Sequence, residues 1–285
     1  EGWGEGIKYM QILMQRLIQA LAALLLCSLF AALPANAQPP LPDRAIHSGD
    51  IVISIIIDDL GNQMAAGRRA IKLPGALTYA FLPHLACSPR LAKLAHRHHK
   101  EVMLHLPMEA DDGEAMGPGG LTRGMNEKQL KNEMRRDINA IPYVRGFNNH
   151  MGSRLTKNLQ RMDWVMQMAM FRNDLYFVDS RTTRDTVALK EAEKHGIRSA
   201  KRDVFLDYKK DNEPIVRQQL KILIERARKK GTALAIGHPY RDTLKVLKAW
   251  LPTLAKQGIK LVPVSELISI RNARRHSRWQ LSSSH

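Results

Sequence analysis

Residues 51–57 of the chain read IVISIII, and Asp58 and Asp59 follow directly. A run that is apolar apart from one serine, and rich in β-branched side chains, is typical of a strand buried on both faces. Such strands occur mainly in parallel sheets that helices cover on both sides. We therefore expect residues 51–57 to form a central strand of an α/β domain, with two adjacent carboxylates at its carboxyl end.

Short apolar strands alternate with amphipathic helices along the rest of the chain. The strands are expected at 77–82, 102–106, 175–178, 233–236 and 259–262, and the helices at 88–98, 126–141, 159–170, 185–195, 211–230 and 243–255. A capping box formed by Asn126 and Gln129 begins one of these helices, and Asp185 is expected to cap another. The alternation predicts a parallel sheet with helices outside it, in one α/β domain.

The composition fits a folded protein that works among anionic polymers. Of the 285 residues, 44% are hydrophobic, which excludes wholesale disorder, and two cysteines exclude both a disulfide scaffold and a cysteine-rich zinc site. Forty-four Lys and Arg against 27 Asp and Glu give a net charge of +17. That excess suits anionic polymers or lipid surfaces of a cell envelope.

The N-terminal segment has the pattern of a secretory signal peptide. Arg16 precedes a mostly apolar run at 17–33, and Ala35-Asn36-Ala37 has the small-x-small pattern of a cleavage site. An uncleaved membrane anchor is the alternative, although the run is near the lower length limit for spanning. Export predicts a periplasmic or extracellular protein with no stable membrane anchor after cleavage and no nucleic-acid partner. The expected organisation is a signal peptide with upstream residues, a linker, a barrel domain and a frayed basic tail, at 1–37, 38–49, 50–270 and 271–285.

Polar side chains interrupt or follow several of the predicted strands. Each has an ordinary structural explanation, such as a strand-ending turn for two adjacent aspartates or a hydrogen-bonded core position for a lone histidine. Chemistry in parallel α/β folds gathers at the carboxyl ends of the strands, so their recurrence there predicts a common site. The residues are Asp58, Asp59, His105, His150, Asp179, Arg202, Asp203 and His238.

Two neutral imidazoles and one carboxylate, with an open position for water, are typical of a catalytic zinc site. The sequence offers Asp59, His105 and His150 as ligands of a divalent metal, most simply zinc. Asp58 and His238 would then be titratable groups beside the metal. His150 lies in the polar segment 146–153, which we expect to be a loop whose asparagines, Asn149 among them, support the ligands.

Six motifs resemble those of the divergent polysaccharide deacetylase family. In chain order they are IIIDDLG, LHLPME, NNHMGS, VDSRT, RDVFLD and IGHP, and the resemblance covers residues 51–268. It implies a distorted (β/α) barrel of the polysaccharide deacetylase type. It also implies that Asp58 is the catalytic base, Asp59 a metal ligand and His238 the general acid.

The second motif departs from the pattern of typical polysaccharide deacetylases. They carry His-x-x-x-His, whereas this chain has His105 followed four residues later by Glu109. The resemblance leaves two alternatives for the missing ligand, since either His150 replaces the second histidine or Glu109 binds the metal itself. The family's Arg-x-Pro-Tyr motif is not recognisable in this chain.

The motifs and the site residues together predict an exported metal-dependent hydrolase that removes N- or O-acetyl groups from an envelope carbohydrate. Asp179, Arg202 and Asp203 are expected to orient the reacting groups, Arg202 by holding the Asp58 carboxylate. One alternative is a degenerate, non-catalytic protein that binds a glycan or a partner on the same barrel. Another is a hydrolase of a different amide or ester.

Overall fold

The computed structural model describes residues 47, 49–172 and 175–283. The predicted signal peptide and nearly all of the predicted linker lie outside the described residues. Within those ranges, no helix combines the length and the apolar character needed to cross a bilayer.

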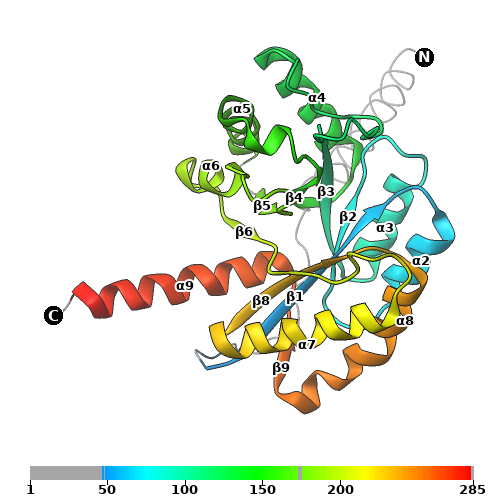
Figure 1. Cartoon of the computed structure of the whole chain (residues 1–285), viewed down its shortest axis with the longest axis vertical. Coiled ribbons are helices and arrows are strands. Elements are labelled where there is room, and N and C mark those ends of the chain that lie inside the picture. The colour runs from blue at the N-terminus through cyan, green and yellow to red at the C-terminus, as the bar shows by residue number, and fades with distance from the viewer. Residues whose placement is uncertain (1–46, 48, 173–174, 284–285) are drawn as a thin grey trace, which may run out of the picture. The chain divides into compact units, whose positions relative to one another are not determined.

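Parallel strands form a single sheet at the centre of the described region (Figure 1). Their order is β6-β5-β4-β3-β2-β1-β8-β7, and β9 pairs with one end of β1. Every pairing is parallel, as the alternation of strands and helices predicts. The strands are β1 (Ile51–Leu60), β2 (Thr78–Phe81), β3 (Glu101–Met108), β4 (Val144–Met151), β5 (Tyr176–Asp179), β6 (Ser199–Lys201), β7 (Val204–Phe205), β8 (Thr232–Gly237) and β9 (Ile259–Leu261).

The sheet curls until its two end strands are joined by two residues. β6 and β7 lie at opposite ends of the strand order, yet only Arg202 and Asp203 separate them in the chain. The Arg202 N–H donates to the Asp179 carbonyl at 3.0 Å, and the Asp203 N–H donates to the Leu234 carbonyl at 2.9 Å. The link thus bridges the two sides of an open seam, and the predicted distorted (β/α) barrel is confirmed.

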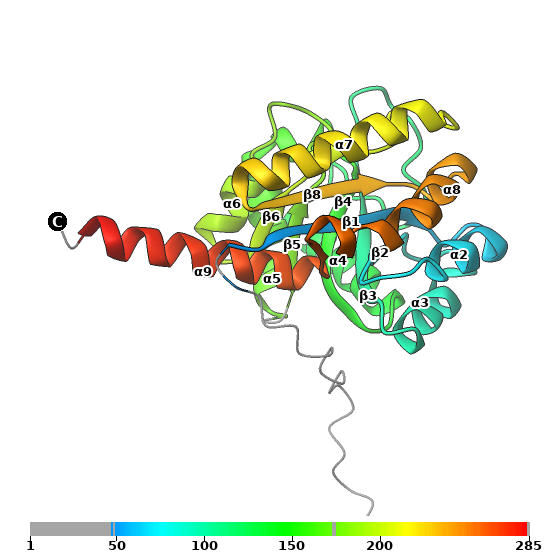
Figure 2. The ribbon, with the colours of Figure 1, turned by 90° about the horizontal axis from the view of Figure 1, so that it is seen from below.

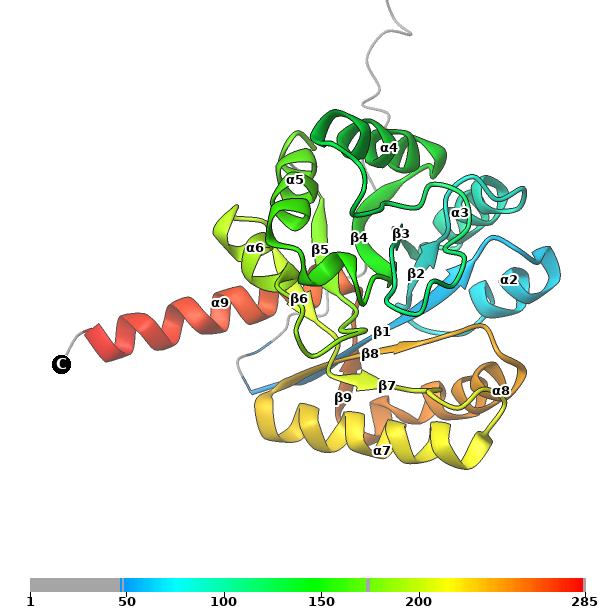
Figure 3. The same ribbon diagram turned by 45° about the horizontal axis from the view of Figure 1, so that its top comes forward.

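Helices lie outside the curled sheet (Figures 2 and 3). The Asn126–Gln129 capping box begins α4 as predicted. Asp185 does not cap α6, which begins three residues later, because the Thr186 hydroxyl bonds Asp179 and accepts the Ala188 N–H. The helices are α2 (Met64–Ile71), α3 (Ser88–Arg97), α4 (Glu127–Ala140), α5 (Leu159–Met170), α6 (Ala188–Lys194), α7 (Glu213–Lys230), α8 (Arg241–Trp250) and α9 (Val264–Ser283).

The two faces of β1 belong to two different cores. Because side chains alternate along a strand, Ile53, Ile55 and Ile57 pack outward under the helices. Val52 and Ile56 point inward, into a smaller cluster that the first turns of α9 complete. Helix α9 therefore belongs partly to the barrel interior.

The prediction that the chain frays from residue 271 is wrong for the first residues of that segment. Helix α9 continues through them, because their arginines bond to the body of the barrel. Arg271 contacts the Asp203 carboxylate at 2.7 Å, and Arg274 donates to the Gly231 and Asp50 carbonyls at 3.1 and 2.9 Å.

The segment expected to be a polar loop around His150 is mostly strand. β4 pairs with β3 over its whole length, with His105 opposite Asn148 and Pro107 opposite His150. It also pairs with β5 on its other side, which buries both of its asparagines. Backbone pairing to two neighbours outweighs the low strand propensity of Asn and Gly here.

Candidate metal centre

Two consecutive aspartates of β1 face the same site, although consecutive strand residues normally point to opposite faces. The backbone of Asp59 is left-handed, with φ of 57°, and the pairing of β1 with β2 shifts register between Ile57 and Leu60. This irregularity turns Asp59 towards the barrel mouth beside Asp58. Asp58 is 2% exposed, whereas the pocket described below opens on Asp59.

Asp59, His105 and His150 bring three potential ligand atoms together. The Asp59 Oδ1 lies 3.1 Å from His105 Nε2 and 3.1 Å from His150 Nδ1, and the two nitrogens are also 3.1 Å apart. Strands β1, β3 and β4 each supply one of the three side chains. The structure thus places the predicted ligand set around one centre.

Asn148 fixes which nitrogen of His105 faces that centre. Its amide nitrogen donates to both oxygens of Asp58, at 2.9 and 3.0 Å, so its oxygen points the other way. That oxygen lies 2.7 Å from His105 Nδ1, which must therefore carry the proton. In the neutral ring the Nε2 lone pair is left facing Asp59 and His150, as a metal ligand requires.

The electrostatics of the cluster favour positive charge at its centre. Burial alone would raise the pKa of Asp59, but the imidazoles of His105 and His150 hold it below its usual range. Burial alone would lower the pKa of His105, but the carboxylates of Asp58 and Asp59 raise it. A cation bound between these groups would supply the charge that a proton otherwise brings.

The residues fit a divalent metal by two further observations. Asp59 Oδ1 is buried and has no hydrogen-bond partner, which is costly unless an ion satisfies it. Ligands at about 2.0 Å from a tetrahedral zinc lie about 3.3 Å from one another, close to the spacing of this triangle. Asp59, His105 and His150 would hold the ion and leave a further position for water or substrate.

His238, which directly follows β8, faces the same centre and is held by a carboxylate of its own. Its Nδ1 lies 2.9 Å from Asp207 Oδ1, while Asp207 Oδ2 accepts the His238 N–H and the Thr243 hydroxyl. This leaves Nε2 directed towards Asp59 Oδ2, 3.6 Å away. Burial alone would lower the pKa of His238, but Asp207, with Asp59 and Asp58, raises it to about 9.

Glu109, the alternative ligand, lies outside the cluster. One carboxylate oxygen is 3.2 Å from Arg154 Nη1, and the other accepts the Arg123 N–H at 2.6 Å. The carboxylate thereby ties together the segments that follow β3 and β4. Of the two alternatives for the missing second histidine, His150 is the one that lies beside Asp59 and His105.

Asn149 also differs from its expected place. It accepts the Ser180 N–H and donates to the Met151 carbonyl, so it braces the ends of β4 and β5. Its neighbour Asn148 contacts His105 and Asp58 instead, and so gives the candidate site the support that we expected from Asn149. Alternation along β4 explains the exchange, because Asn148 and His150, two residues apart, share a face.

The other three residues that we expected to support the site form their hydrogen bonds away from it. Asp179 accepts the Arg181 N–H and the Thr186 hydroxyl. Arg202 donates to the carbonyls of Ser180 and Arg181 in the barrel seam, so its charge acts on Asp58 without a hydrogen bond. Asp203 accepts the Leu234 N–H and binds Arg271, which makes it an anchor for α9.

Sequence reasoning assigned no role to Asp207 and expected of Asn148 only general support, as one asparagine of a loop, although both residues stand in the quoted motifs. Treating NNH as a strand would have placed Asn148 on the same face as His150. Asp207 ends the RDVFLD motif just after β7, where a carboxylate at a strand end is the same signal that identified Asp58. No sequence feature shows that it pairs with His238, since that contact spans 31 residues.

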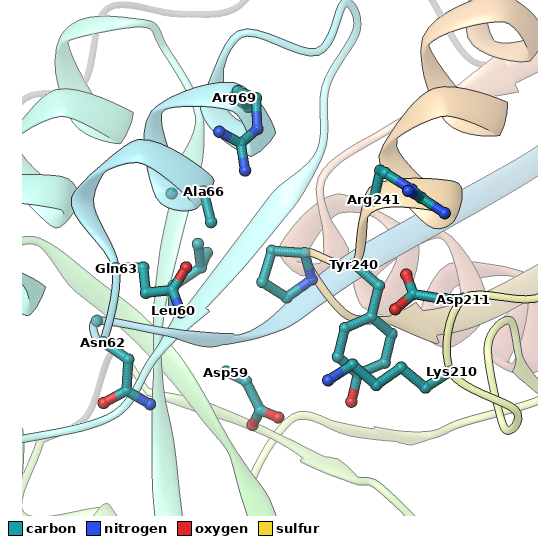
Figure 4. Close-up of a pocket in the computed structure, with 13 residues that line it drawn as sticks. Asp59, Leu60, Asn62, Gln63, Ala66, Arg69, Lys210, Asp211, Tyr240 and Arg241 are labelled. Atoms are coloured by element: carbon teal, nitrogen blue, oxygen red, sulfur yellow. The ribbon is translucent and has the colours of Figure 1, made fainter.

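A pocket of about 360 Å³ opens beside Asp59 (Figure 4). Its walls come from the segment after β1, the start of α2, the segment before α7 and the start of α8. Tyr240 lies beside Lys210. Asp59 lies on one side of this pocket and Arg69 on the opposite side. The pocket therefore opens onto one residue of the candidate ligand triangle.

Comparisons with known proteins agree with this fold. Residues 55–268 match the family described as divergent polysaccharide deacetylase. The uncharacterized protein YibQ of Escherichia coli (strain K12) is 36% identical over 240 residues, which are 84% of this chain and 72% of YibQ. The crystal structure of the uncharacterized protein ATU2773 from Agrobacterium tumefaciens C58 has a TM-score of 0.74 at 24% identity, covering 81% of this chain and 92% of that one. A mutant of BA3943, described as a CE4 family pseudoenzyme with restored enzymatic activity, has a TM-score of 0.50 at 17% identity, covering 78% and 69%.

Proposed function

The chain belongs to the divergent polysaccharide deacetylase family, and from this premise we propose that it is a metal-dependent hydrolase. Its substrate would be an acetylated carbohydrate of the cell envelope, from which it removes N- or O-acetyl groups. The proposal includes export, with the active protein periplasmic or extracellular and the metal most simply zinc.

One observation carries the proposal. A buried carboxylate oxygen and two imidazole nitrogens converge to 3.1 Å, and the carboxylate oxygen lacks any hydrogen-bond partner. A purely structural cluster would satisfy its buried polar atoms, because an unpaired one costs about 1–3 kcal/mol. This supports an ion site over a degenerate binding protein.

A divalent metal at these ligands would supply a Lewis acid for the acetyl carbonyl and lower the pKa of a water. Asp58 takes the proton of the attacking water. Its Oδ2 lies 3.6 Å from His105 Nε2, beside the ligand triangle, and burial raises its pKa, which strengthens it as a base. Asn148 holds both of its oxygens, so the carboxylate cannot rotate away.

His238 serves as the general acid for the leaving group. Asp207 holds its Nδ1, so the proton for the departing amine or alcohol comes from Nε2. Asp207, the largest of the causes that raise the pKa of this ring, favours its protonated form. Base and acid thus come from different parts of the barrel, because Asp58 belongs to β1 and His238 directly follows β8.

Metal content and acetate release, measured on the same protein, test this proposal. We expect one divalent ion per chain and acetate release from N-acetylated or O-acetylated glycans that stops when a chelator removes the ion. In Asp58→Asn the ion should stay bound while kcat falls about 10²–10⁴-fold, because only proton transfer is lost.

Two results would contradict the proposal. Full activity of Asp58→Asn would remove Asp58 as the base. Purified protein that binds glycans, binds no added divalent ion and shows no chelator-sensitive activity would favour the degenerate binding protein. Asp185→Asn is the matched control, because Asp185 is exposed and belongs neither to the ligand triangle nor to the pocket lining.

A further inference from the structure

The pocket beside Asp59 carries an excess of positive charge. Its lining contains Arg69, Lys210 and Arg241 but only two acidic side chains, Asp59 and Asp211. Asp59 belongs to the ligand triangle, so a bound metal would use its charge. With Asp59 committed in this way, three cations face one carboxylate.

Two of these cations lack a carboxylate partner within the described part of the chain. The third cation, Arg241, does have such a partner, because its Nε lies 3.2 Å from Asp242 Oδ1. Arg69 has no ion pair among the described residues, and Lys210 contacts only the face of Tyr240, with its Nζ 5.3 Å from the ring centroid. Charges left unpaired around a concave surface attract an oppositely charged ligand.

Tyr240 connects this charged region to the catalytic groups. Its ring stacks on His238, with centroids 5.2 Å apart and planes 23° apart, and Lys210 lies at the same ring (Figure 4). An aromatic face offers apolar area to one side of a sugar ring while its hydroxyl stays polar. A sugar placed there has its acetyl group near Asp59 and its other substituents near Arg69 and Lys210.

The backbone contributes the same sign of potential. Helices α2 and α8 both begin at the pocket wall, and neither has a side-chain hydrogen bond capping its first turn. The partial positive charge at these helix ends adds to that of the side chains.

We propose that this pocket selects an acetylated sugar with an anionic substituent, a carboxylate or a phosphate ester, which Arg69 and Lys210 bind while Asp59 and the metal face the acetyl group. This inference rests on the proposed hydrolase function and narrows its substrate class. It makes Arg69 and Lys210 specificity residues that take no part in proton transfer.

The chain contains its own matched controls. Arg68 and Lys209 are exposed neighbours of Arg69 and Lys210, with the same charges, and neither lines the pocket. A general effect of the protein's net charge would be the same for each neighbouring pair. Only an effect of the pocket distinguishes Arg69 from Arg68 and Lys210 from Lys209.

Substrates that differ only in charge test the inference. The carboxylate arm compares the disaccharide of N-acetylglucosamine and N-acetylmuramic acid with its methyl ester, and the phosphate arm compares N-acetylglucosamine 6-phosphate with N-acetylglucosamine. We expect kcat/KM for acetate release to be about tenfold higher for the charged member of at least one pair. Arg69→Gln and Lys210→Gln should remove most of that preference, and Arg68→Gln and Lys209→Gln should keep it.

Equilibrium binding to Asp58→Asn separates failure of this inference from failure of the hydrolase function. If no probe releases acetate but the charged sugars still bind more tightly, in a way that needs Arg69 and Lys210, the inference stands and the hydrolase function fails. If acetate release is observed but charged and neutral probes are equivalent, or Arg69→Gln matches Arg68→Gln, the inference is overturned. Equal binding of charged and neutral sugars when no acetate is released also overturns it.

Discussion

Both ends of the barrel interior bury carboxylates, and the two ends treat them differently. At the end where α9 enters, Glu101 is 6% exposed, and its Oε1 accepts from the Thr78 hydroxyl, the Tyr176 hydroxyl and the Ser265 N–H. At the opposite end, Asp59 Oδ1 is buried without any hydrogen-bond partner, 3.1 Å from two imidazole nitrogens.

The difference separates a cluster that holds the fold from one arranged for a ligand. Around Glu101 the donors come from β2, β5 and the first turn of α9, so the carboxylate joins elements distant in the chain. Around Asp59 the groups present lone pairs to a common point, which destabilises the empty arrangement. At these two ends, the satisfied carboxylate belongs to the packing of the fold, whereas the unsatisfied one faces the candidate ion site.

The largest expected effect is on metal binding at the unsatisfied end. Asp59→Ala should lower metal affinity by more than about 100-fold, the loss that outer-shell substitutions alone can reach. The metal-free variant should lose less stability than Glu101→Ala, because Asp59 Oδ1 accepts no hydrogen bond and only the attraction of the neighbouring imidazoles is lost. Metal titration and urea unfolding measure both effects, and a large loss of metal-free stability would erase the distinction between the two ends.

Substitution at the satisfied end should have the opposite consequences. Glu101→Ala leaves two hydroxyls and one backbone N–H without their acceptor, so we expect a loss of about 3 kcal/mol in the free energy of unfolding. The metal stoichiometry of the folded protein should not change. Glu101→Gln keeps an acceptor oxygen and should lose less, and calorimetry with metal analysis would show whether the two properties separate in this way.

A smaller effect is expected from the asparagine that orients His105. Asn148→Ala should weaken metal binding about 10–100-fold, because the His105 tautomer and the Asp58 carboxylate lose their common partner. Asn149→Ala is the adjacent control, since its bonds go to Met151 and Ser180. Equal metal affinities of these two variants in a competition titration would contradict the assignment of Asn148.

A further, pH-dependent effect concerns Asp137, another buried carboxylate that lies outside both clusters. Burial and Glu133 raise its pKa to about 8, against the opposing charge of Arg136, while His84 Nε2 lies 2.8 Å from one oxygen. Because the folded pKa exceeds the unfolded value of 3.8, its contribution to stability is complete below that value and is lost as pH rises towards 8.

The stability of Asp137→Asn relative to the parent should therefore rise with pH between about 4 and 8, by at most about 1.4 kcal/mol per pH unit. Urea midpoints of both proteins across this range measure the difference. A difference independent of pH would show that Asp137 is ionised in the folded protein throughout.

The patterns that could be predicted are those that depend on neighbours in the chain. The run at 51–57, the capping box at Asn126 and the helix expected at 211–230 follow from local periodicity and capping, and all appear in the structure. The β4 segment was expected to be a loop because its composition suits one. Its strand conformation comes from pairing with β3 and β5, which no local property of the segment reveals.

The same division runs through the candidate site. Positions at the ends of apolar strands identified Asp58, Asp59, His105 and His238, and the polar segment 146–153 identified His150. The partners of these residues were harder to predict, because Asn148 and Asp207 act through contacts across the barrel. Asp203, Glu109 and Asn149 have the appropriate residue types and positions, yet the structure uses them to brace loops and α9.

The sequence by itself determined the alternating α/β order, the strand that carries both aspartates and the residue types able to bind a divalent ion, because these depend on local periodicity and side-chain chemistry. Only the tertiary structure decided which atoms converge, through the left-handed turn at Asp59 and the face of β4 that reaches the interior. It also placed Arg69 and Lys210 beside the same centre. Such convergence depends on strand register and on contacts between distant segments, and neither is encoded in any short stretch of the chain.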